Sequence, residues 1–227
     1  PFRELPLQDE LAPPVEALEL ADHPADSRIR WFDPALPKVP LEIAATGPQV
    51  IRLAGRVADR VMFTLGAVPD RIAWGIDEAR AAARAAGRDP ATLAFGAYVN
   101  LVCHPDTAVA RALVRGGLTT FARFSVMHGA VAGPVDPATR EVLARLHDGY
   151  DMRAHTRADS SQAALLDDAF VDRFAIAGPP AHCLARLREL RALGLDRIVI
   201  SGPTAGTIPA AAREAMALLD RAVIGRL

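Results

Sequence analysis

Aromatic residues make up only 5% of this chain of 227 residues, and cysteine occurs twice, as Cys103 and Cys183. Two cysteines this far apart do not form the dense disulfide framework of a small secreted domain, so we expect a reduced, cytoplasmic protein. No apolar run approaches the about 20 residues that cross a bilayer. The formal net charge of -1 predicts no basic surface, so we expect neither nucleic acid nor a membrane as a partner.

Several familiar catalytic motifs are also missing. The sequence has no Walker A loop, no Gly-x-Gly-x-x-Gly turn and no Ser–His–Asp arrangement. Cys103-His104 and His182-Cys183 look superficially like a metal-binding quartet. Zinc ligands usually come as spaced pairs, however, and neighbouring residues on a strand point to opposite faces, so we expect no metal site.

The chain is rich in apolar residues, which make up 51% of it. This is the composition of a globular protein, and the chain can be one large domain or two small ones. A domain of this size buries roughly 70–75% of its unfolded surface. Prolines crowd residues 1–38, where we expect an extended connection with a helical turn at 15–21 and a short strand at 27–33.

A strand–helix–strand unit at residues 39–67 is the most informative segment. Two short apolar strands, 41–45 and 61–64, each end in a turn rich in Gly and Thr, and a compact helix lies between them. Thr46 is expected at the N-cap of that helix and Pro48 in its first turn. Because loops at the carboxyl ends of parallel strands build active sites, chemistry is expected at these turns.

Further strand and helix patterns follow along the chain. Strands are expected at 93–102 and 197–201, and helices at 70–86, 106–117, 138–147, 161–173, 181–193 and 209–224. Between about 118 and 175 the regular rhythm breaks into helical pieces with glycines and prolines. Four parallel strands with helices between them fit either an open doubly wound sheet or part of a (β/α)8 barrel.

Six segments carry a resemblance to a known family. They are PLEIAATGP at 40–48, ADRVMFTLGA at 58–67, AAGRDP at 85–90, GYDM at 149–152 with His155, FVDRFAIAGPP at 170–180 and GLDRIVI at 194–200. In this order and spacing the chain resembles the bacterial luciferase-like monooxygenase superfamily. The branch it resembles is that of coenzyme F-420-dependent oxidoreductases related to methylenetetrahydromethanopterin reductase.

The resemblance implies an α/β fold of the TIM-barrel type, with a helical insertion before the last strand. The four expected strands look like barrel strands five to eight, so residues 39–227 would be the C-terminal half of the barrel, with the insertion at about 118–175. Such a half barrel has two open edges and an uncovered inner face. We therefore expect a piece of a longer chain, or a half barrel that pairs, with a homodimer as the expected oligomer.

The function implied by the resemblance is that of a flavin- or deazaflavin-dependent oxidoreductase or monooxygenase. It would use coenzyme F-420, or alternatively FMN, to act on a small organic substrate. Two alternatives remain: a non-catalytic half barrel that associates with itself or a partner, and a small open-sheet binding protein. A non-sequential order of strands in space would favour the last.

The turns after the first two strands hold the expected cofactor-binding residues. Gly47 lets the backbone approach a ligand, and the free N–H groups of the next helix turn favour an anion, although an ordinary helix cap is the alternative. The resemblance places the cofactor's phosphate side chain near Ala45, Thr46 and Gly47. Thr64 and Gly66 are expected at the same mouth, where Thr64 could equally fill a strand position.

Four other residues are the expected substrate pocket. Asn100 could point at the ring system, and His104 is either a proton shuttle or a loop residue. The resemblance places Tyr150 and His155 near the barrel mouth, although this pair could instead tie the insertion down.

Two further candidates are secondary. Arg71 either reaches a substrate anion or is a solvated helix residue. The turn Ser201-Gly202-Pro203 follows the last strand, where other barrels bind phosphate.

Overall fold

The computed structural model describes residues 35–203 and 209–227, and the chain divides into two units, Pro1–Pro40 and Leu41–Leu227. The helical turn expected at 15–21 and the strand expected at 27–33 lie outside the described residues. The second unit contains all the helices and strands described below.

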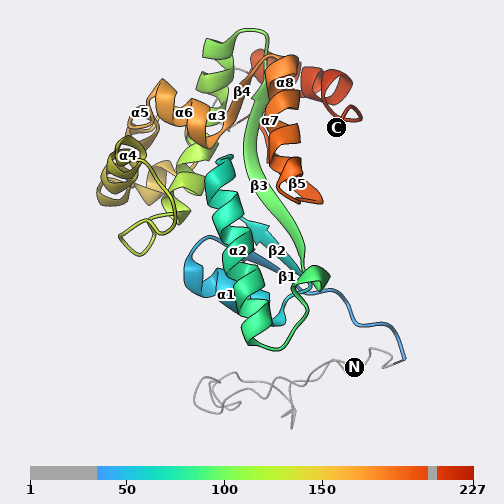
Figure 1. Ribbon diagram of the computed structural model, residues 1–227. Coiled ribbons are helices and arrows are strands. Elements are labelled where there is room, and N and C mark those ends of the chain that lie inside the picture. Colours follow the sequence, from blue (N-terminus) through green and yellow to red (C-terminus); the bar gives the residue numbers. More distant parts are fainter. Residues whose placement is uncertain (1–34, 204–208) are drawn as a thin grey trace, which may run out of the picture. The chain divides into compact units, whose positions relative to one another are not determined.

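A parallel sheet forms the centre of the second unit (Figure 1). β1 (Glu42–Ala45) pairs with β2 (Arg60–Phe63), β2 pairs with β3 (Ala94–Cys103), and β3 pairs with β5 (Arg197–Ser201). These four strands therefore lie side by side in the order of the sequence, as in a (β/α)8 barrel and not as in the open-sheet alternative. The short strand β4 (Ile176–Gly178) pairs with the far end of β3 and was not predicted.

The described part of the chain contains eight α-helices, of which α1 to α7 lie between strands and α8 follows the last strand. They are α1 (Pro48–Val57), α2 (Pro69–Ala85), α3 (Thr107–Phe124), α4 (Pro137–Asp148), α5 (Ser161–Ala164), α6 (Asp168–Phe174), α7 (Pro180–Ala192) and α8 (Pro209–Ala222). The single helix predicted at 161–173 is wrong, because the Asp167 side chain accepts a hydrogen bond from Phe170 N and starts a new helix there. α3 continues beyond its predicted end at 117.

The two faces of the sheet differ. Phe95, Val99 and Leu101 of β3 pack into one hydrophobic core with residues of α1, α2 and α7. Because successive side chains of a strand point to opposite faces, Gly96, Tyr98 and Asn100 belong to the other face, which would line the interior of a barrel. That face is covered incompletely: Val199 of β5 is 39% exposed.

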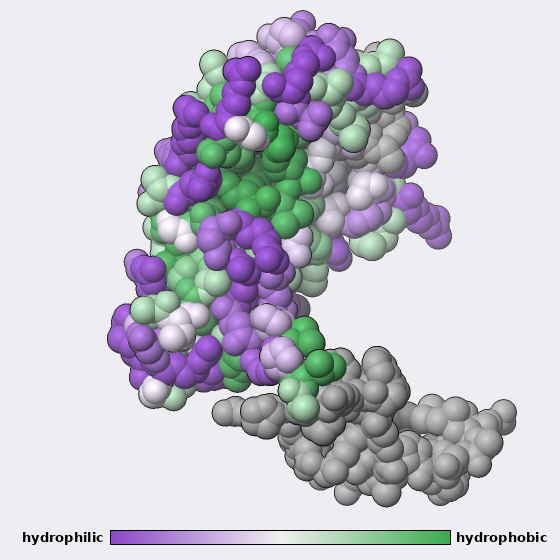
Figure 2. Space-filling model, turned by 90° about the vertical axis from the view of Figure 1, so that its right-hand side faces the viewer, coloured by the Kyte–Doolittle hydropathy of each residue, from purple (hydrophilic) through white to green (hydrophobic). Residues whose placement is uncertain are grey.

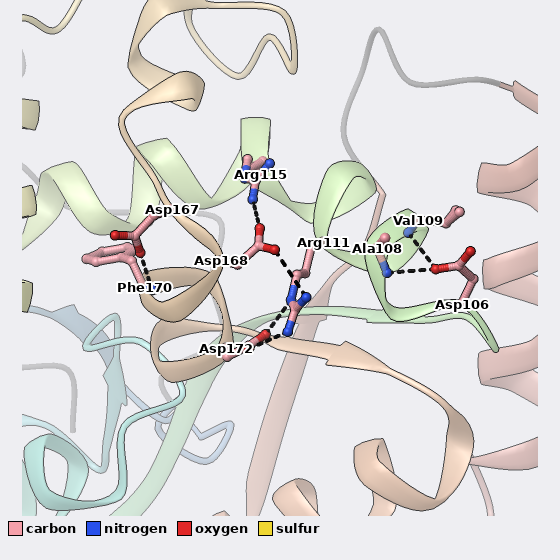
Figure 3. A network of polar contacts seen from close by, with 9 residues as sticks. All are labelled: Asp106, Ala108, Val109, Arg111, Arg115, Asp167, Asp168, Phe170 and Asp172. Carbon is pink, nitrogen blue, oxygen red and sulfur yellow. Dashed lines mark hydrogen bonds and ion pairs between the residues drawn. The ribbon is translucent and has the colours of Figure 1, made fainter.

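The insertion forms a second core around α3, with buried side chains that include Leu118, Leu143 and Phe170. Figure 3 shows how α6 is held on α3. Arg111 of α3 binds Asp172 through two hydrogen bonds of 2.8 and 2.6 Å, and Asp168 lies between Arg111 and Arg115. The network fixes the orientation of α6, whose last residue, Phe174, reaches the loop after β2.

In the described residues, the sheet has unpaired outer edges and α1 has exposed apolar side chains. β1 and β5 each pair with one strand, and α1 exposes Val50, Leu53 and Val57, which share one face of the helix. β5 lies toward the right of Figure 1, and Figure 2, which turns that side to the viewer, shows a hydrophobic area flanked by hydrophilic residues. Open edges and an exposed helix stripe are what half of a closed barrel presents.

The close contact of α1 and α2 generates a stability prediction. A Cβ atom at Gly55 would lie 2.3 Å from Ala79 O of α2. We expect Gly55→Ala to lower the free energy of unfolding by about 1–3 kcal/mol, because the helices must move apart. Replacing glycine by alanine inside a helix ordinarily raises the free energy of unfolding by about 1 kcal/mol. A decrease would therefore show that the two helices are in close contact at Gly55.

Urea denaturation followed by circular dichroism measures this effect. The neighbouring exposed residue provides the control: Arg56→Ala should change stability by less than about 0.5 kcal/mol. A Gly55→Ala variant as stable as the parent would contradict the close helix contact.

Candidate functional site

A cavity of about 520 Å³ lies at the carboxyl end of β1. One wall is the start of α1 with the residues before it, and the other is the last residue of α3 with the segment that follows it. The lining residues are Ala44, Thr46, Gly47, Pro48, Gln49, Val50, Phe124, Ser125, Met127, His128, Ala130 and Ala132. Of the residues predicted from the sequence, Thr46 and Gly47 line this cavity.

Parallel pairing of β1 and β2 places two threonines together. Thr64 N donates to Ala45 O at 3.0 Å, and the hydroxyls of Thr46 and Thr64 are in contact. The prediction that Thr46 caps α1 is wrong: Gly47 is the N-cap residue, and no side chain caps the helix. Ala45 itself points into the helix-covered core, so it offers no side chain to the cavity.

The start of α1 presents free backbone amides. The first hydrogen bond of the helix runs from Ile51 N to Gly47 O, at 3.0 Å. The amides of Gln49 and Val50 come before it and have no acceptor within the helix, and Pro48 has no N–H. A Cβ atom at Gly47 would meet no atom within 4 Å, so the backbone is open here. The arrangement suits a negatively charged group.

Gly66 is tightly packed, in contrast to Gly47. It adopts a left-handed conformation with φ +78°, and a Cβ atom would lie 2.5 Å from the ring of Phe174. Gly66 is buried. The need for glycine at this position is therefore explained by the packing of Phe174.

Arg71 is neither solvated nor at the mouth. Its side chain is 1% exposed, and its guanidinium donates to Leu65 O at 3.1 Å, Ala132 O at 3.1 Å and Ser125 Oγ at 3.3 Å. Burial lowers the pKa of Arg71 to about 10, so the group stays charged at neutral pH. A buried positive charge thus lies behind the cavity wall that contains Ser125 and Ala132.

Tyr98 and Asn100 of β3 lie on the inner face of the sheet, close to Thr64. The register pairs Phe63 with Ala97, so Tyr98 comes level with Thr64, and Asn100 follows on the same face. Asn100 is 2% exposed, and its Nδ2 atom has no hydrogen-bond partner among the described residues. Tyr98 was not predicted, although the alternation along the strand could have indicated it.

His104 lies far along the chain direction of β3 from Thr64 and Tyr98. It comes six residues after Tyr98, which along a strand corresponds to about 20 Å. Its ring Nδ1 accepts a hydrogen bond from Asp106 N at 3.0 Å, in the turn that starts α3. The structure therefore favours the loop interpretation of His104 over that of a proton shuttle.

Tyr150 and His155 contact each other but do not line the cavity. The Tyr150 hydroxyl lies 2.8 Å from His155 Nδ1, and the guanidinium of Arg123 lies over the tyrosine ring at 4.7 Å. These contacts join the segment after α4 to the end of α3. They agree with the interpretation that this pair ties the insertion down.

The far wall of the cavity is made of residues that were not predicted from the sequence. Ser125, Met127 and His128 lie in irregular backbone after α3, without apolar periodicity. A separate hollow of about 400 Å³ lies beside Gly202 and Pro203, between the ends of β3 and β5 and α8.

The described residues contain no group of three His, Cys, Asp or Glu side chains placed to hold a metal ion. Cys103 and Cys183 are both buried, and burial raises the pKa of both thiols, that of Cys183 to about 12. Within the described ranges no helix is long and apolar enough to span a bilayer.

Comparisons with known proteins agree with the geometry. A 5,10-methylenetetrahydromethanopterin reductase of Methanolobus tindarius is 27% identical over 187 residues, which are 82% of this chain and 54% of that protein. The solved coenzyme F-420-dependent tetrahydromethanopterin reductase of Methanopyrus kandleri superposes with a TM-score of 0.55 at 20% identity, over 82% of this chain and 50% of that chain.

An F-420-dependent secondary alcohol dehydrogenase, solved with an F-420-acetone adduct, superposes with a TM-score of 0.56 at 15% identity, over 82% of this chain and 48% of that chain. The chain thus spans about half the length of the relatives it matches. The fold is that of the C-terminal half of a luciferase-like TIM barrel. The luciferase-like monooxygenase family matches residues 17–197, and the chain belongs to this family.

Proposed function

We propose that this chain is part of an oxidoreductase that binds coenzyme F-420, or alternatively FMN, and acts on a small organic substrate. The open backbone at Gly47, where the free amides of α1 meet a cavity, is the observation that carries this proposal. The family and the F-420-dependent relatives support it. We expect the protein in the cytoplasm.

The anionic tail of the cofactor would bind at the start of α1. The amides of Gln49 and Val50 and the positive end of the helix dipole, equivalent to about half an elementary charge, attract a phosphate there. The buried charge of Arg71 behind the opposite wall adds to the positive potential. Both F-420 and FMN carry such a phosphate, so this feature does not separate them.

The ring of the cofactor would extend from the cavity along the inner face of the sheet. Asn100 lies there with an Nδ2 donor that has no partner among residues 35–203 and 209–227, and a carbonyl oxygen of the ring would satisfy it. When bound, the cofactor supplies the redox chemistry. The chain's own residues bind the tail, orient the ring against β3 and exclude water.

Gly47→Val tests the position of the tail. Valine adopts the φ of -97° and ψ of 159° at Gly47 without strain, and its Cβ atom would meet no atom within 4 Å, so the melting temperature should hardly change. Its side chain would occupy the path of the phosphate. Titration of the full chain with F-420 and with FMN, followed by fluorescence and absorbance, should show binding to the parent and a loss of at least about tenfold in the variant.

Gly202→Val is the matched control. Gly202 also follows a strand and also has open space around its Cβ position. We expect unchanged affinity in this control. Loss of binding in Gly202→Val but not in Gly47→Val would move the phosphate to the end of β5.

Asn100→Leu should separate stability from binding. Leucine has a similar shape and removes the unpaired buried donor, so the free energy of unfolding without ligand should rise by about 1 kcal/mol. Cofactor affinity should fall, because the donor is gone. Asn100→Asp buries a carboxylate and should destabilise the protein. A destabilised Asn100→Leu variant would contradict the absence of a partner for Nδ2.

A half barrel that pairs is the second candidate, favoured by the unpaired edges of β1 and β5 and the exposed stripe Val50, Leu53 and Val57. Analytical ultracentrifugation of the 227-residue chain should then show a dimer that binds neither cofactor. A monomer at micromolar concentration would contradict this candidate. A dimer that binds F-420 or FMN would unite pairing with the enzymatic proposal.

A further inference from the structure

Arg71 is the largest of the fully buried side chains in the described residues. Placing a charged guanidinium in a protein interior is costly unless its donors are satisfied. Its hydrogen-bond partners in the described residues are oxygen atoms of Leu65, Ser125, Ala132 and Pro134, and none of these is a carboxylate. The ring of Phe174 lies 5.9 Å from the guanidinium carbon and adds a cation–π contact.

Three of these four partners belong to the same irregular segment. Ser125 Oγ, Ala132 O and Pro134 O accept at 3.3, 3.1 and 3.4 Å, whereas Leu65 belongs to the loop after β2. Residues 125–134 contain turns and bends but no helix or strand. The planar guanidinium of Arg71 therefore joins this segment to the start of α2. A lysine at the same position has a single ammonium group, which cannot reach all of these acceptors.

The same segment forms the far wall of the cavity. Ser125, Met127, His128, Ala130 and Ala132 line it, opposite Thr46, Gly47 and Gln49. Two of the residues that Arg71 holds, Ser125 and Ala132, are thus themselves wall residues. Arg71 therefore contacts the cavity wall from the side that faces away from the start of α1.

We infer that Arg71 is a positioning residue for ligand binding: it holds residues 125–134 as the wall that closes the anion-binding cavity against the start of α1. It acts through Ser125 and Ala132 and does not touch the ligand. This inference rests on the proposed function for its effect on affinity. The effect on the wall itself is independent of any cofactor.

Arg71→Lys tests this inference in the full chain, because lysine keeps the charge but loses the fork. Without ligand, hydrogen–deuterium exchange of the 125–134 backbone should become at least about tenfold faster than in the parent. Affinity for F-420 or FMN should fall by about tenfold or more. Arg84→Lys, at an exposed position of the same helix, is the matched control and should change neither quantity.

Ser125→Ala provides a milder second variant, since it removes one acceptor and leaves the buried charge three others. It should raise exchange in the same segment by a smaller factor. Unchanged exchange at 125–134 in folded Arg71→Lys would overturn the inference. Faster exchange with unchanged affinity would overturn the link to binding. If the parent binds neither cofactor, the proposed function fails, and the exchange comparison alone decides whether Arg71 holds the wall.

Discussion

The parallel register of β1 and β2 is the constraint on which the site depends. The strands pair Ala45 with Phe63, and Thr64 N donates a hydrogen bond to Ala45 O. Thr46 and Thr64, which follow the two strands, therefore leave the sheet side by side. This puts the Thr46 and Thr64 hydroxyls in contact and turns the start of α1 toward the same rim. Because β3 continues the register, Tyr98 and Asn100 follow on the inner face.

The cavity combines this barrel rim with the helical insertion. Asp168 and Asp172 bind arginines of α3 and hold α6, whose Phe174 packs on Gly66 and beneath the guanidinium of Arg71. Each of these partly exposed ion pairs contributes little to stability by itself, because solvent screens the charges. Their effect is on geometry, because they hold the helix that places the Phe174 ring against Gly66 and Arg71.

Much of the fold follows from the sequence, since apolar runs and glycine or proline punctuation located β1, β2, β3 and β5 within one residue. β4 escaped prediction because it has three residues and is completed by pairing with the end of β3. His104 follows the end of β3, as predicted, but β3 continues six residues beyond its pairing with β2, which the sequence pattern does not show and which carries His104 away from Thr64. Arg71 and the wall at 125–134 depend on tertiary contacts, for which local periodicity gives no signal.

We propose that the amides at the start of α1 receive the anionic tail of a flavin-like cofactor. A crystal structure of the full chain with coenzyme F-420 bound would test it most directly. We expect a phosphate oxygen at about 3 Å from the backbone nitrogen of Gln49 or Val50, with no side chain between them. A phosphate bound beside Gly202, with the start of α1 left in water, would contradict it.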